Sequence, residues 1–482
     1  MSASIKKDHK IIVEEFFNFE EENNLFAKKI KNVRFWEFIR FDIYEQILIQ
    51  HNILDKRPNG SIKFSTKLRF LINGVFNLRK NPYLVKQKKV VIISNARRNL
   101  LNDGYWWNIH FDPIIDIFND DYMLFEFPFM FSHNNNIKTS NIRFIDFVII
   151  VSNFKKIFLK RRMNFSDPES EFLSDIELQL HLKFGIKINL KFIILNFLLK
   201  RESILNLYSK LIRRINPKIV ILTVSYGKEI LIEVLKKLNI PIVELQHGVI
   251  SKYVLAYSFP SNSMIKLNFP DYFFSFSNIW TQGIYMPLLK ENIKDVGFPY
   301  FDLQFNNNRQ KGRKKQILIL SQWTIGSKMI DLLFKIKDNL RDGYTIVYKL
   351  HPYEFSNWRN LYPELVKSNV QIIESNQPDI YQLFAESEIL IGVYSTAVIE
   401  GLAFGLKTFI YELPGVEHLE IFFEKNLFTR FKTGDELLTF LNQKNDHVVK
   451  DINDVRELIF RSESKLNMQQ EIKKILAVHD SD

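Results

Sequence analysis

Residues able to do chemistry follow several short apolar runs of the sequence. Gln246-His247-Gly248 comes directly after the run Ile242–Leu245. The pKa of histidine lies near neutrality, so His247 is a candidate general base. Glycine permits a close backbone approach or a positive φ, which Gly248 could supply beside a ligand. The alternative interpretation is a tight strand–helix turn around a hydrogen-bonded histidine.

A second group of such residues lies near the C-terminal end of the chain. Ser395 and Thr396 stand where a helix should begin after the run Ile389–Val393, and Glu400 lies about one turn further on. Backbone N–H groups and hydroxyls at a helix start, beside the positive end of the helix dipole, form a natural phosphate pocket. Glu400 could accept hydrogen bonds from ribose hydroxyls. A plain N-cap is the alternative interpretation.

Two further strand ends carry polar residues. His351-Pro352 follows the run Thr345–Leu350, and Ser321-Gln322 follows Ile317–Leu320. A histidine whose backbone is held by proline could donate to a phosphate oxygen or stack on a base, although a lone histidine is more often structural. Lys349 should point to the same face of its strand as His351 and would add a cation near the same place.

The elements that must position these residues are strands alternating with helix-length segments. This order predicts parallel sheets of the βαβ kind, in which ligands bind beyond the carboxyl ends of the strands. Because a polar, basic stretch near residue 310 is typical of a linker, we expect a helical N-terminal extension (1–85), an N-terminal domain (86–305) and a C-terminal domain (306–482). The expected strands are Lys88–Ser94, Ile219–Val224, Ile242–Leu245, Tyr272–Phe276, Ile317–Leu320, Thr345–Leu350, Val370–Ile373, Ile389–Val393 and Thr408–Tyr411.

Composition and missing motifs exclude several classes of protein. The 482 residues carry a net charge of 66 − 54 = +12, which suits a polyanion, a phosphorylated substrate or an anionic membrane surface. The absence of cysteine excludes disulfide scaffolds, thiolate zinc sites and iron–sulfur clusters. Dinucleotide-binding and P-loop glycine motifs, an internal Asp-x-Asp pair, metal-ligand spacing and nucleic-acid signatures are also missing. We therefore expect no bound metal or cofactor and no nucleic-acid partner.

Membrane contact is expected only at the surface. No apolar segment follows the N-terminal lysines, and the longest apolar stretches fall short of the ~20 residues that a spanning helix needs. We expect a cytoplasmic protein. Phe154–Phe165 and Leu190–Ile215 interleave apolar and basic residues and could lie on the inner face of the cell membrane. Ordinary core helices are the alternative.

Taken in order, the motifs around His247, His351 and Ser395-Thr396 resemble those of bacterial surface-polysaccharide glycosyltransferases of the GT-B type, over roughly residues 215–420. The sequence is similar to capsule and lipopolysaccharide transferases that use CMP-linked acidic sugars such as Kdo or sialic acid. It also resembles the teichoic-acid polymerases that use CDP-glycerol. The resemblance implies an α/β GT-B fold, in which two Rossmann-like domains face a central cleft. It also implies metal-independent transfer, with the nucleotide on the C-terminal half.

The resemblance assigns the donor-binding residues to the C-terminal domain. His351 matches the His-Pro histidine, expected at the nucleotide phosphate or base. Ser395 and Thr396 match the phosphate-binding pair, and Glu400 matches an acidic position that could hold ribose. The full expected donor site is Gln322, Lys349, His351, Ser395, Thr396 and Glu400.

The acceptor side is expected on the N-terminal domain. His247 matches the His-Gly histidine, which is the candidate base in the glycerol-phosphate enzymes, and Gln246 and Gly248 are expected to contact the acceptor. The acidic motif of the sialyltransferases has no obvious counterpart. Asp103 is therefore the expected fallback catalytic carboxylate, and Asp112 is another candidate.

We expect a metal-independent glycosyltransferase that moves a sugar from a nucleotide-activated donor, with a CMP-linked acidic sugar favoured, to a growing surface polysaccharide or a lipid-linked glycan. The alternatives are a CDP-glycerol or CDP-ribitol phosphotransferase of the teichoic-acid type, a nucleotide-sugar epimerase on the same fold, and a non-catalytic scaffold of envelope assembly. The sequence leaves the donor, acceptor, linkage, stereochemistry and oligomeric state open.

Overall fold

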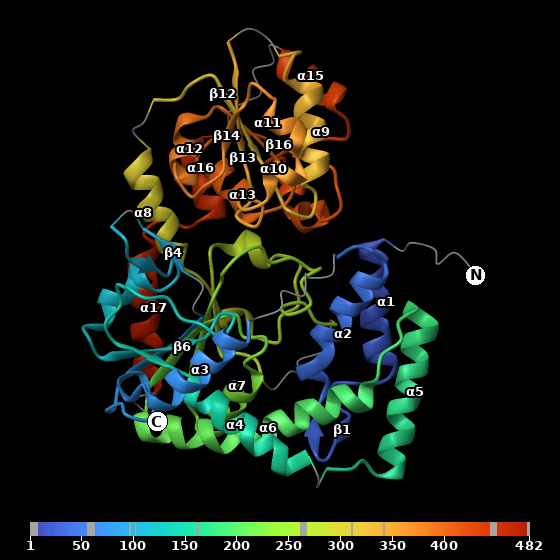
Figure 1. Cartoon of the computed structure of the whole chain (residues 1–482), viewed down its shortest axis with the longest axis vertical. Coiled ribbons are helices and arrows are strands. Elements are labelled where there is room, and N and C mark those ends of the chain that lie inside the picture. The colour runs from blue at the N-terminus through green and yellow to red at the C-terminus, as the bar shows by residue number, and fades with distance from the viewer. Residues whose placement is uncertain are drawn as a thin grey trace.

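The computed structural model forms two α/β domains, which lie one above the other in Figure 1. Each domain is built on a parallel β-sheet, and a group of helices from the N-terminal part of the chain lies beside the lower domain. The described residues are 8–54, 63–95, 98–101, 103–160, 163–260, 268–309, 312–340, 343–443 and 451–479.

The C-terminal domain contains a six-stranded parallel sheet of order β14-β13-β12-β15-β16-β17. Numbered along the chain, the strands lie in the order 3-2-1-4-5-6, the Rossmann order. The chain starts at β12, runs outward to β14, and then returns to β15 on the other side of β12. β12 is buried along its whole length, as expected for a central strand covered on both faces. The strands are β12 (Gln316–Leu320), β13 (Thr345–Lys349), β14 (Gln371–Ile373), β15 (Ile389–Gly392), β16 (Lys407–Tyr411) and β17 (Thr429–Phe431).

The N-terminal domain repeats this arrangement with one more strand. Its parallel sheet has the order β11-β10-β9-β8-β3-β6-β7, so the order reverses between β3 and β8. The expected pair of Rossmann-like domains, and with it the GT-B fold class, is confirmed. The strands are β3 (Val90–Asn95), β6 (Tyr122–Phe127), β7 (Ile142–Phe144), β8 (Ile219–Thr223), β9 (Ile242–Leu245), β10 (Tyr272–Ser275) and β11 (Ile293–Asp295); two small hairpins are β1 (Lys29–Ile30) with β2 (Val33–Arg34), and β4 (Asn99–Leu100) with β5 (Trp106–Trp107).

Helices cover both faces of the N-terminal sheet. One face packs against α4, α6 and α7, and the other against a short 3₁₀ segment, Asp112–Phe118, and α17. The helices are α1 (His9–Glu22), α2 (Trp36–Gln50), α3 (Phe64–Phe76), α4 (Asp146–Leu159), α5 (Asp167–Phe184), α6 (Leu190–Ile215), α7 (Glu229–Lys237), α8 (Pro299–Asn308), α9 (Gly326–Ile336), α10 (Trp358–Leu361), α11 (Pro363–Val366), α12 (Ile380–Glu386), α13 (Thr396–Ala403), α14 (Glu420–Glu424), α15 (Gly434–Asn442), α16 (Ile452–Ile459) and α17 (Ser464–His479).

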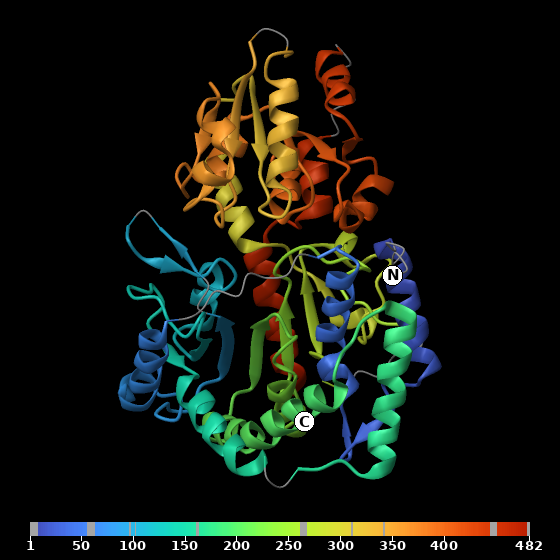
Figure 2. The ribbon, with the colours of Figure 1, turned by 45° about the vertical axis from the view of Figure 1, so that its right-hand side comes forward.

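The chain crosses between the domains twice. The first crossing leads through α8, and the second follows α16, after which α17 returns along the N-terminal domain (Figure 2). The two crossings touch at Gly297, whose φ is +89° and where a Cβ atom would lie 2.0 Å from the carbonyl oxygen of Arg461. The expected C-terminal domain, 306–482, thus includes a helix that packs on the other domain.

The N-terminal extension is anchored by a buried ion pair. Arg40 on α2 donates to both carboxylate oxygens of Glu20 on α1, at 2.7 and 2.8 Å, and both side chains are buried. The same guanidinium donates to the carbonyl oxygens of Leu255 and, at 3.2 Å, Ser258. The extension therefore holds the loop that follows Gln246-His247-Gly248.

All nine expected strands are present, each within about two residues of its predicted ends. The β6, β7, β11 and β17 strands were not predicted. Of the two candidate membrane segments, Leu190–Ile215 forms α6, which buries ten residues and is a core helix. In Phe154–Phe165, helix α4 ends at Leu159, and residues 161–162 lie outside the described residues. None of the helices in the described ranges has the combination of length and apolarity that crossing a bilayer requires.

The buried ion pair predicts a large loss of stability when one partner is removed. Arg40→Ala should lower the free energy of unfolding by about 3–5 kcal/mol, because it leaves the Glu20 carboxylate buried without its partner. Urea denaturation at neutral pH measures this. Lys474→Ala, which removes an exposed partner of Glu471 at 2.6 Å, is the control and should cost less than about 1 kcal/mol. Equal losses in the two variants would contradict the anchoring role.

Candidate active site

The Gln-His-Gly turn after β9 meets the start of α13 where the two domains face each other. A Cβ atom built on Gly248 would lie 3.5 Å from Oγ1 of Thr396. The fold therefore brings together two of the residues selected from the sequence, one from each domain.

The start of α13 has the geometry of an anion-binding helix end. Ser395 is the N-cap, and its side chain accepts a hydrogen bond from the N–H of Val398 at 3.3 Å. Capping, the alternative interpretation of Ser395, is thus observed. Thr396 is the first helical residue, and both residues are partly exposed. The positive end of the helix dipole and the Thr396 hydroxyl together can bind a phosphate.

Gln322 holds the loop that precedes this helix. Its side-chain amide donates to the carbonyl oxygen of Tyr394 at 2.9 Å, and its oxygen accepts from the Tyr394 N–H at 3.1 Å. These two bonds join the loops after β12 and β15, where the strand order of the sheet reverses and where such folds bind ligands. Gln322 is therefore a positioning residue for Ser395 and Thr396.

Glu354, which the sequence analysis did not select, positions the His-Pro turn. This buried carboxylate accepts hydrogen bonds from the Tyr362 hydroxyl at 2.7 Å, the Ser321 hydroxyl at 3.0 Å and the backbone N–H of His351 at 2.6 Å. An acidic residue three positions after His351 was the available signal, because a Glu side chain can accept from the backbone N–H three positions earlier, as it does in a capping box.

Exposed aromatic side chains surround His351. Its ring stacks on Tyr353 with a centroid distance of 5.4 Å, and Trp323 makes an edge contact with Tyr353 at 6.3 Å. Tyr353 is 63% exposed and Trp323 is 40% exposed. Aromatic faces of this kind, at the carboxyl ends of β12 and β13, can stack on a planar base. The sequence analysis missed both residues.

Lys349 lies beneath the same loop. Its ammonium donates to the carbonyl oxygen of Ser375 and lies 4.8 Å from the centroid of the Phe355 ring. Burial lowers the pKa of Lys349 to about 8, against the opposing effect of Asp379. The lysine therefore remains mostly charged at neutral pH.

Glu400 is buried in the first turns of α13. Burial raises its pKa to about 7, although a hydrogen bond from Tyr381 acts in the opposite direction. Tyr300 packs against Tyr381 with ring centroids 5.6 Å apart, and Trp107 of the β4–β5 hairpin packs against Tyr300 at 5.7 Å. The N-terminal domain thus contributes to the aromatic surroundings of this carboxyl group.

His247 is oriented by a buried tyrosine and carboxylate. The Tyr257 hydroxyl donates to Oε1 of Glu244 at 2.6 Å and lies 3.4 Å from Nδ1 of His247. The Tyr257 hydroxyl uses its hydrogen in the bond to Glu244, so its oxygen can accept a hydrogen bond from Nδ1–H of His247. In the tautomer protonated at Nδ1, Nε2 is the basic nitrogen. Tyr257 and Glu244 thus orient His247, and a base oriented in this way by neighbouring groups is common where a nucleophile is activated.

The carboxylate behind His247 is deeply buried. Burial raises the pKa of Glu244, while the hydrogen bonds from Tyr257 and Ser225 and the nearby Lys228 lower it. Burial also lowers the pKa of Lys228 to about 8, and its ammonium donates to the carbonyl oxygen of Val224 at 2.5 Å. Val224 has a φ of +60°, an outlier for a β-branched residue of the kind that collects at functional sites.

Gln246 is buried below the turn. Its oxygen accepts from the Phe276 N–H at 2.8 Å and from the Ser275 hydroxyl at 3.1 Å, and its amide donates to the carbonyl oxygen of Gly248 at 2.9 Å. These bonds make Gln246 a positioning residue for the turn. Its expected contact with the acceptor stays a prediction.

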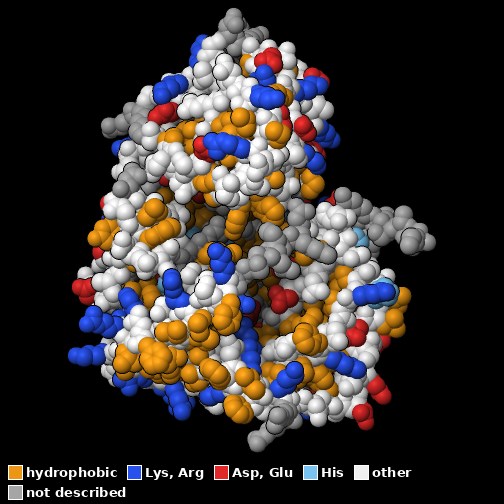
Figure 3. Space-filling view, in the orientation of Figure 1, with side chains coloured by type: hydrophobic (Ala, Val, Ile, Leu, Met, Phe, Trp, Pro, Cys, Tyr) orange, Lys and Arg blue, Asp and Glu red, His pale blue; other side chains and the backbone are white. Residues whose placement is uncertain are grey.

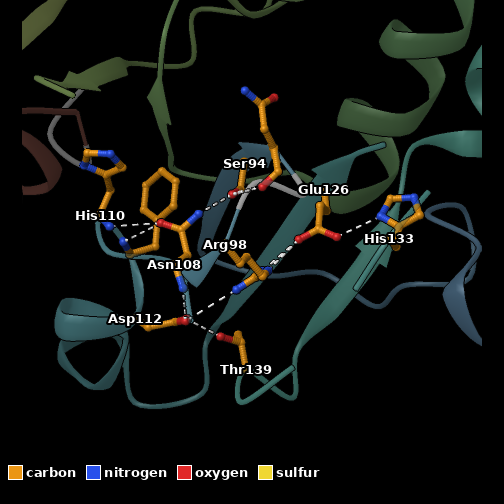
Figure 4. A network of polar contacts seen from close by, with 10 residues as sticks. Ser94, Arg98, Asn108, His110, Asp112, Glu126, His133 and Thr139 are labelled. Carbon is orange, nitrogen blue, oxygen red and sulfur yellow. Dashed lines mark hydrogen bonds and ion pairs between the residues drawn. The ribbon is translucent and has the colours of Figure 1, made fainter. Parts of the chain in front are cut away.

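The two fallback carboxylates lie in different surroundings. Asp103 is about half exposed beside the β4–β5 hairpin, where it accepts from the Tyr105 N–H at 3.1 Å and lies 3.7 Å from Lys138. Asp112 belongs to a buried network, in which it pairs with Arg98 at 3.4 Å and accepts from the Asn108 N–H at 2.6 Å (Figure 4). Burial raises the pKa of Asp112.

The same network continues to His133, which the sequence analysis did not select. Glu126, at the carboxyl end of β6, bonds Arg98 at 2.9 Å and Nδ1 of His133 at 2.7 Å (Figure 4). Nε2 of His133 bonds Asp146 at 2.9 Å. Burial alone would lower the pKa of His133, but the two carboxylates raise it above its usual value. A cavity of about 1090 Å³ lies beside this histidine, away from the Gln-His-Gly turn.

One cluster among the described residues has the composition of a metal site. The ligand atoms of His9, Glu417 and His418 all lie within 4.8 Å of one another. Each residue also has a hydrogen-bond partner: His9 bonds Glu417 at 2.5 Å, and Nδ1 of His418 lies 2.8 Å from the Ser251 hydroxyl. Hydrogen bonding therefore accounts for the cluster, which joins α1 and both domains.

Comparison with known proteins gives fold likenesses at low identity. No family model and no curated protein matches the chain. S. aureus MnaA in a co-structure with UDP has a TM-score of 0.48 and 12% identity, over 81% of this chain and 98% of that one. UDP-GlcNAc 2-epimerase from Methanocaldococcus jannaschii has a TM-score of 0.44 and 15% identity, over 80% and 99%. The wall teichoic acid polymerase TagF has a TM-score of 0.42 and 14% identity, over 87% and 98%.

The raised pKa of Glu400 predicts a pH-dependent effect on stability. Between the ordinary glutamate pKa of 4.5 and the folded-state pKa of about 7, the folded state binds more protons than the unfolded state, so this residue lowers stability as pH rises. Glu400→Gln should therefore gain stability relative to the parent protein between pH 5 and pH 8, by about 2–3 kcal/mol. Unfolding at several pH values measures the gain. The exposed Glu424→Gln is the control, and a pH-independent difference for Glu400→Gln would contradict the assignment.

Proposed function

We propose that this chain is a nucleotide-sugar-dependent transferase that works in the gap between its two domains. The observation that carries the proposal is the approach of Gly248 to Thr396. This approach brings the turn that carries His247 next to the helix start that carries Ser395 and Thr396. We further propose a metal-independent glycosyltransferase, with a CMP-linked acidic sugar as the favoured donor and a surface polysaccharide or lipid-linked glycan as acceptor.

The donor would bind to the C-terminal domain. Its phosphate would accept hydrogen bonds from the start of α13 and from the Thr396 hydroxyl, while Gln322 holds the preceding loop in place. The exposed rings of Trp323 and Tyr353 would stack on the base. The ionised Glu400 would accept from the ribose hydroxyls, which favours the charged form of the carboxyl group.

The proposed chemistry is a displacement at the anomeric carbon. Nε2 of His247 takes the proton of an acceptor hydroxyl, and the acceptor oxygen forms a bond to the anomeric carbon. The bond from that carbon to the phosphate oxygen breaks, and the nucleotide leaves with its electron pair. The helix dipole of α13, with His351 and the charged Lys349, would stabilise the negative charge that develops on the leaving phosphate.

Buried groups support the proton transfer. When His247 becomes an imidazolium, its Nδ1–H is held by Tyr257, whose own proton is held by Glu244. In this tautomer Nε2 would act as the base, and the nearby carboxylate would stabilise the positive charge. Tyr257 and Glu244 are positioning residues in this scheme.

The same geometry favours one second candidate. A histidine base beside a phosphate-binding helix start also suits transfer of a glycerol-phosphate or ribitol-phosphate group from a CDP-linked donor. In that reaction the acceptor oxygen attacks phosphorus, and CMP leaves. The two reactions differ in the donor and in the bond formed, so binding measurements separate them.

Nucleotide binding tests the donor site. Calorimetry with CMP, CDP, UDP and GDP, with and without Mg²⁺, should show saturable binding that does not depend on the metal. His351→Ala should weaken binding by about tenfold or more, since it removes a hydrogen bond to a charged group. A preference for CMP would favour the acidic-sugar donor and a preference for CDP the phosphotransferase. Absence of binding to all four would refute the proposed function and favour the scaffold.

The base assignment predicts a separation of rate from binding. His247→Ala should retain nucleotide affinity and reduce kcat by about 100-fold or more. Tyr257→Phe removes only the hydroxyl that orients His247, so it should reduce kcat less and alter the pH–rate profile. Asp103→Asn is the comparison for the fallback carboxylate. If His247→Ala keeps nearly the parent rate and Asp103→Asn loses it, the base is Asp103.

A further inference from the structure

An apolar face of the N-terminal domain is exposed on helix α3. In this helix only Phe70 is buried. The exposed side chains include Phe64 at 79% and Phe76 at 77%, and their spacing places them along one side of the helix. The exposed apolar residues of α3 are Phe64, Leu68, Leu71, Ile72, Val75 and Phe76.

Helix α4 extends the same face. Gly74 allows the two helices to pack closely, because a Cβ atom there would lie 2.4 Å from Cδ1 of Ile150 on α4. Beyond this contact the C-terminal half of α4 exposes Phe154 and, three and four positions later on the same side of the helix, Ile157 and Phe158. We call the exposed apolar residues of α3 and α4 the α3–α4 face. Contiguous apolar surface of this kind marks an interaction site.

The charges around the α3–α4 face have one sign. Residues 63–80 contain five cations and no acid, and residues 146–160 contain three cations and one acid, Asp146. Asp146 is buried and bonded to His133. In the described part of the chain no ion pair engages the eight cations, which are Lys63, Lys67, Arg69, Arg79, Lys80, Lys155, Lys156 and Lys160.

The surface view agrees with this distribution. Figure 3 shows hydrophobic side chains gathered on the lower part of the molecule with Lys and Arg side chains around them, where Figure 1 places α3 and α4. A partner for this surface must offer both negative charge and an apolar layer. Two copies of the face would repel each other through their like charges. A nucleic acid would satisfy the cations but has no apolar layer to receive a row of Phe, Leu and Ile side chains.

We propose that the α3–α4 face docks on the surface of a bilayer that contains anionic phospholipids. The apolar side chains of both helices would enter the boundary between headgroups and acyl chains, and the surrounding Lys and Arg would bind the headgroup phosphates. Both helices would then lie in the membrane plane. The sequence analysis predicted membrane contact for Phe154–Phe165 and Leu190–Ile215. The docking surface proposed here contains part of the first segment together with α3.

Vesicle co-sedimentation of the full chain tests the docking surface. The protein should bind vesicles containing about one third phosphatidylglycerol, and bind phosphatidylcholine vesicles at least about tenfold less. Rising salt should weaken the binding, because it screens the cations. Equal binding to neutral and anionic vesicles, or binding to neither, would overturn the proposal.

Substitutions locate the surface. The triple variant Leu68→Gln, Ile72→Gln, Phe76→Gln should lose about tenfold or more of its vesicle binding while keeping its melting temperature, since all three side chains are exposed. The control is Leu361→Gln with Val366→Gln on the C-terminal domain, where exposure is similar at 52% and 51%. Equal losses in the two variants would overturn the assignment to α3.

A separate charge variant tests the role of the cations. Lys155→Gln, Lys156→Gln, Lys160→Gln should weaken binding to anionic vesicles and reduce its salt dependence. Sedimentation velocity without lipid tests the competing occupant. Dimerisation abolished by the α3 variant would show that a second copy covers the face and would overturn the proposal. Vesicle binding by a chain that binds no nucleotide would refute the proposed function and leave the docking surface intact.

Discussion

The buried guanidinium of Arg40 is the interaction on which the geometry around His247 depends. One side chain satisfies the Glu20 carboxylate and two backbone carbonyl groups of the loop after the Gln-His-Gly turn. A charge removed from water is tolerated only when it is paired and fully hydrogen-bonded. The N-terminal helices must therefore stay docked, and while they do, the loop that carries Tyr257 stays next to His247.

Hydrogen bonds of buried side chains also fix the turns at the strand ends. Gln322, Gln246 and Glu354 use their hydrogen-bonding capacity on backbone groups and neighbouring side chains. They fix the turns that present Thr396, His247 and His351. Two Rossmann-like sheets place these turns at the carboxyl ends of their strands. Residues whose polar atoms are already bonded therefore set the geometry of these turns.

The strands and the turns that carry the candidate site residues could be predicted from the sequence, whereas most of the residues that hold these turns in place could not. Apolar runs such as Ile317–Leu320 are buried on both faces and stand out by composition alone. Strand β6 was not predicted; it contains Glu126, whose charge is balanced by residues distant in sequence. Glu244 and Tyr257 are thirteen positions apart, and neither spacing nor residue type shows that they meet. Helix α3 was assigned to a helical region without a motif, because exposure cannot be read from apolar periodicity.

The two domains are joined by aromatic packing at one place and by polar hydrogen bonds at another. This difference constrains how the domains can separate. At the chain crossing, Phe460 packs on Phe301 with ring centroids 4.2 Å apart and on Phe276 at 5.4 Å, in a buried aromatic cluster. On the side of α1, the domains are joined by polar bonds, Ser251 to His418 and Tyr253 to Glu420. A polar bond that water can replace contributes only about 1 kcal/mol, whereas exposing a buried aromatic ring costs about 1.5–3 kcal/mol. Separation of the two domains should therefore hinge at the aromatic crossing and break the polar bonds beside α1.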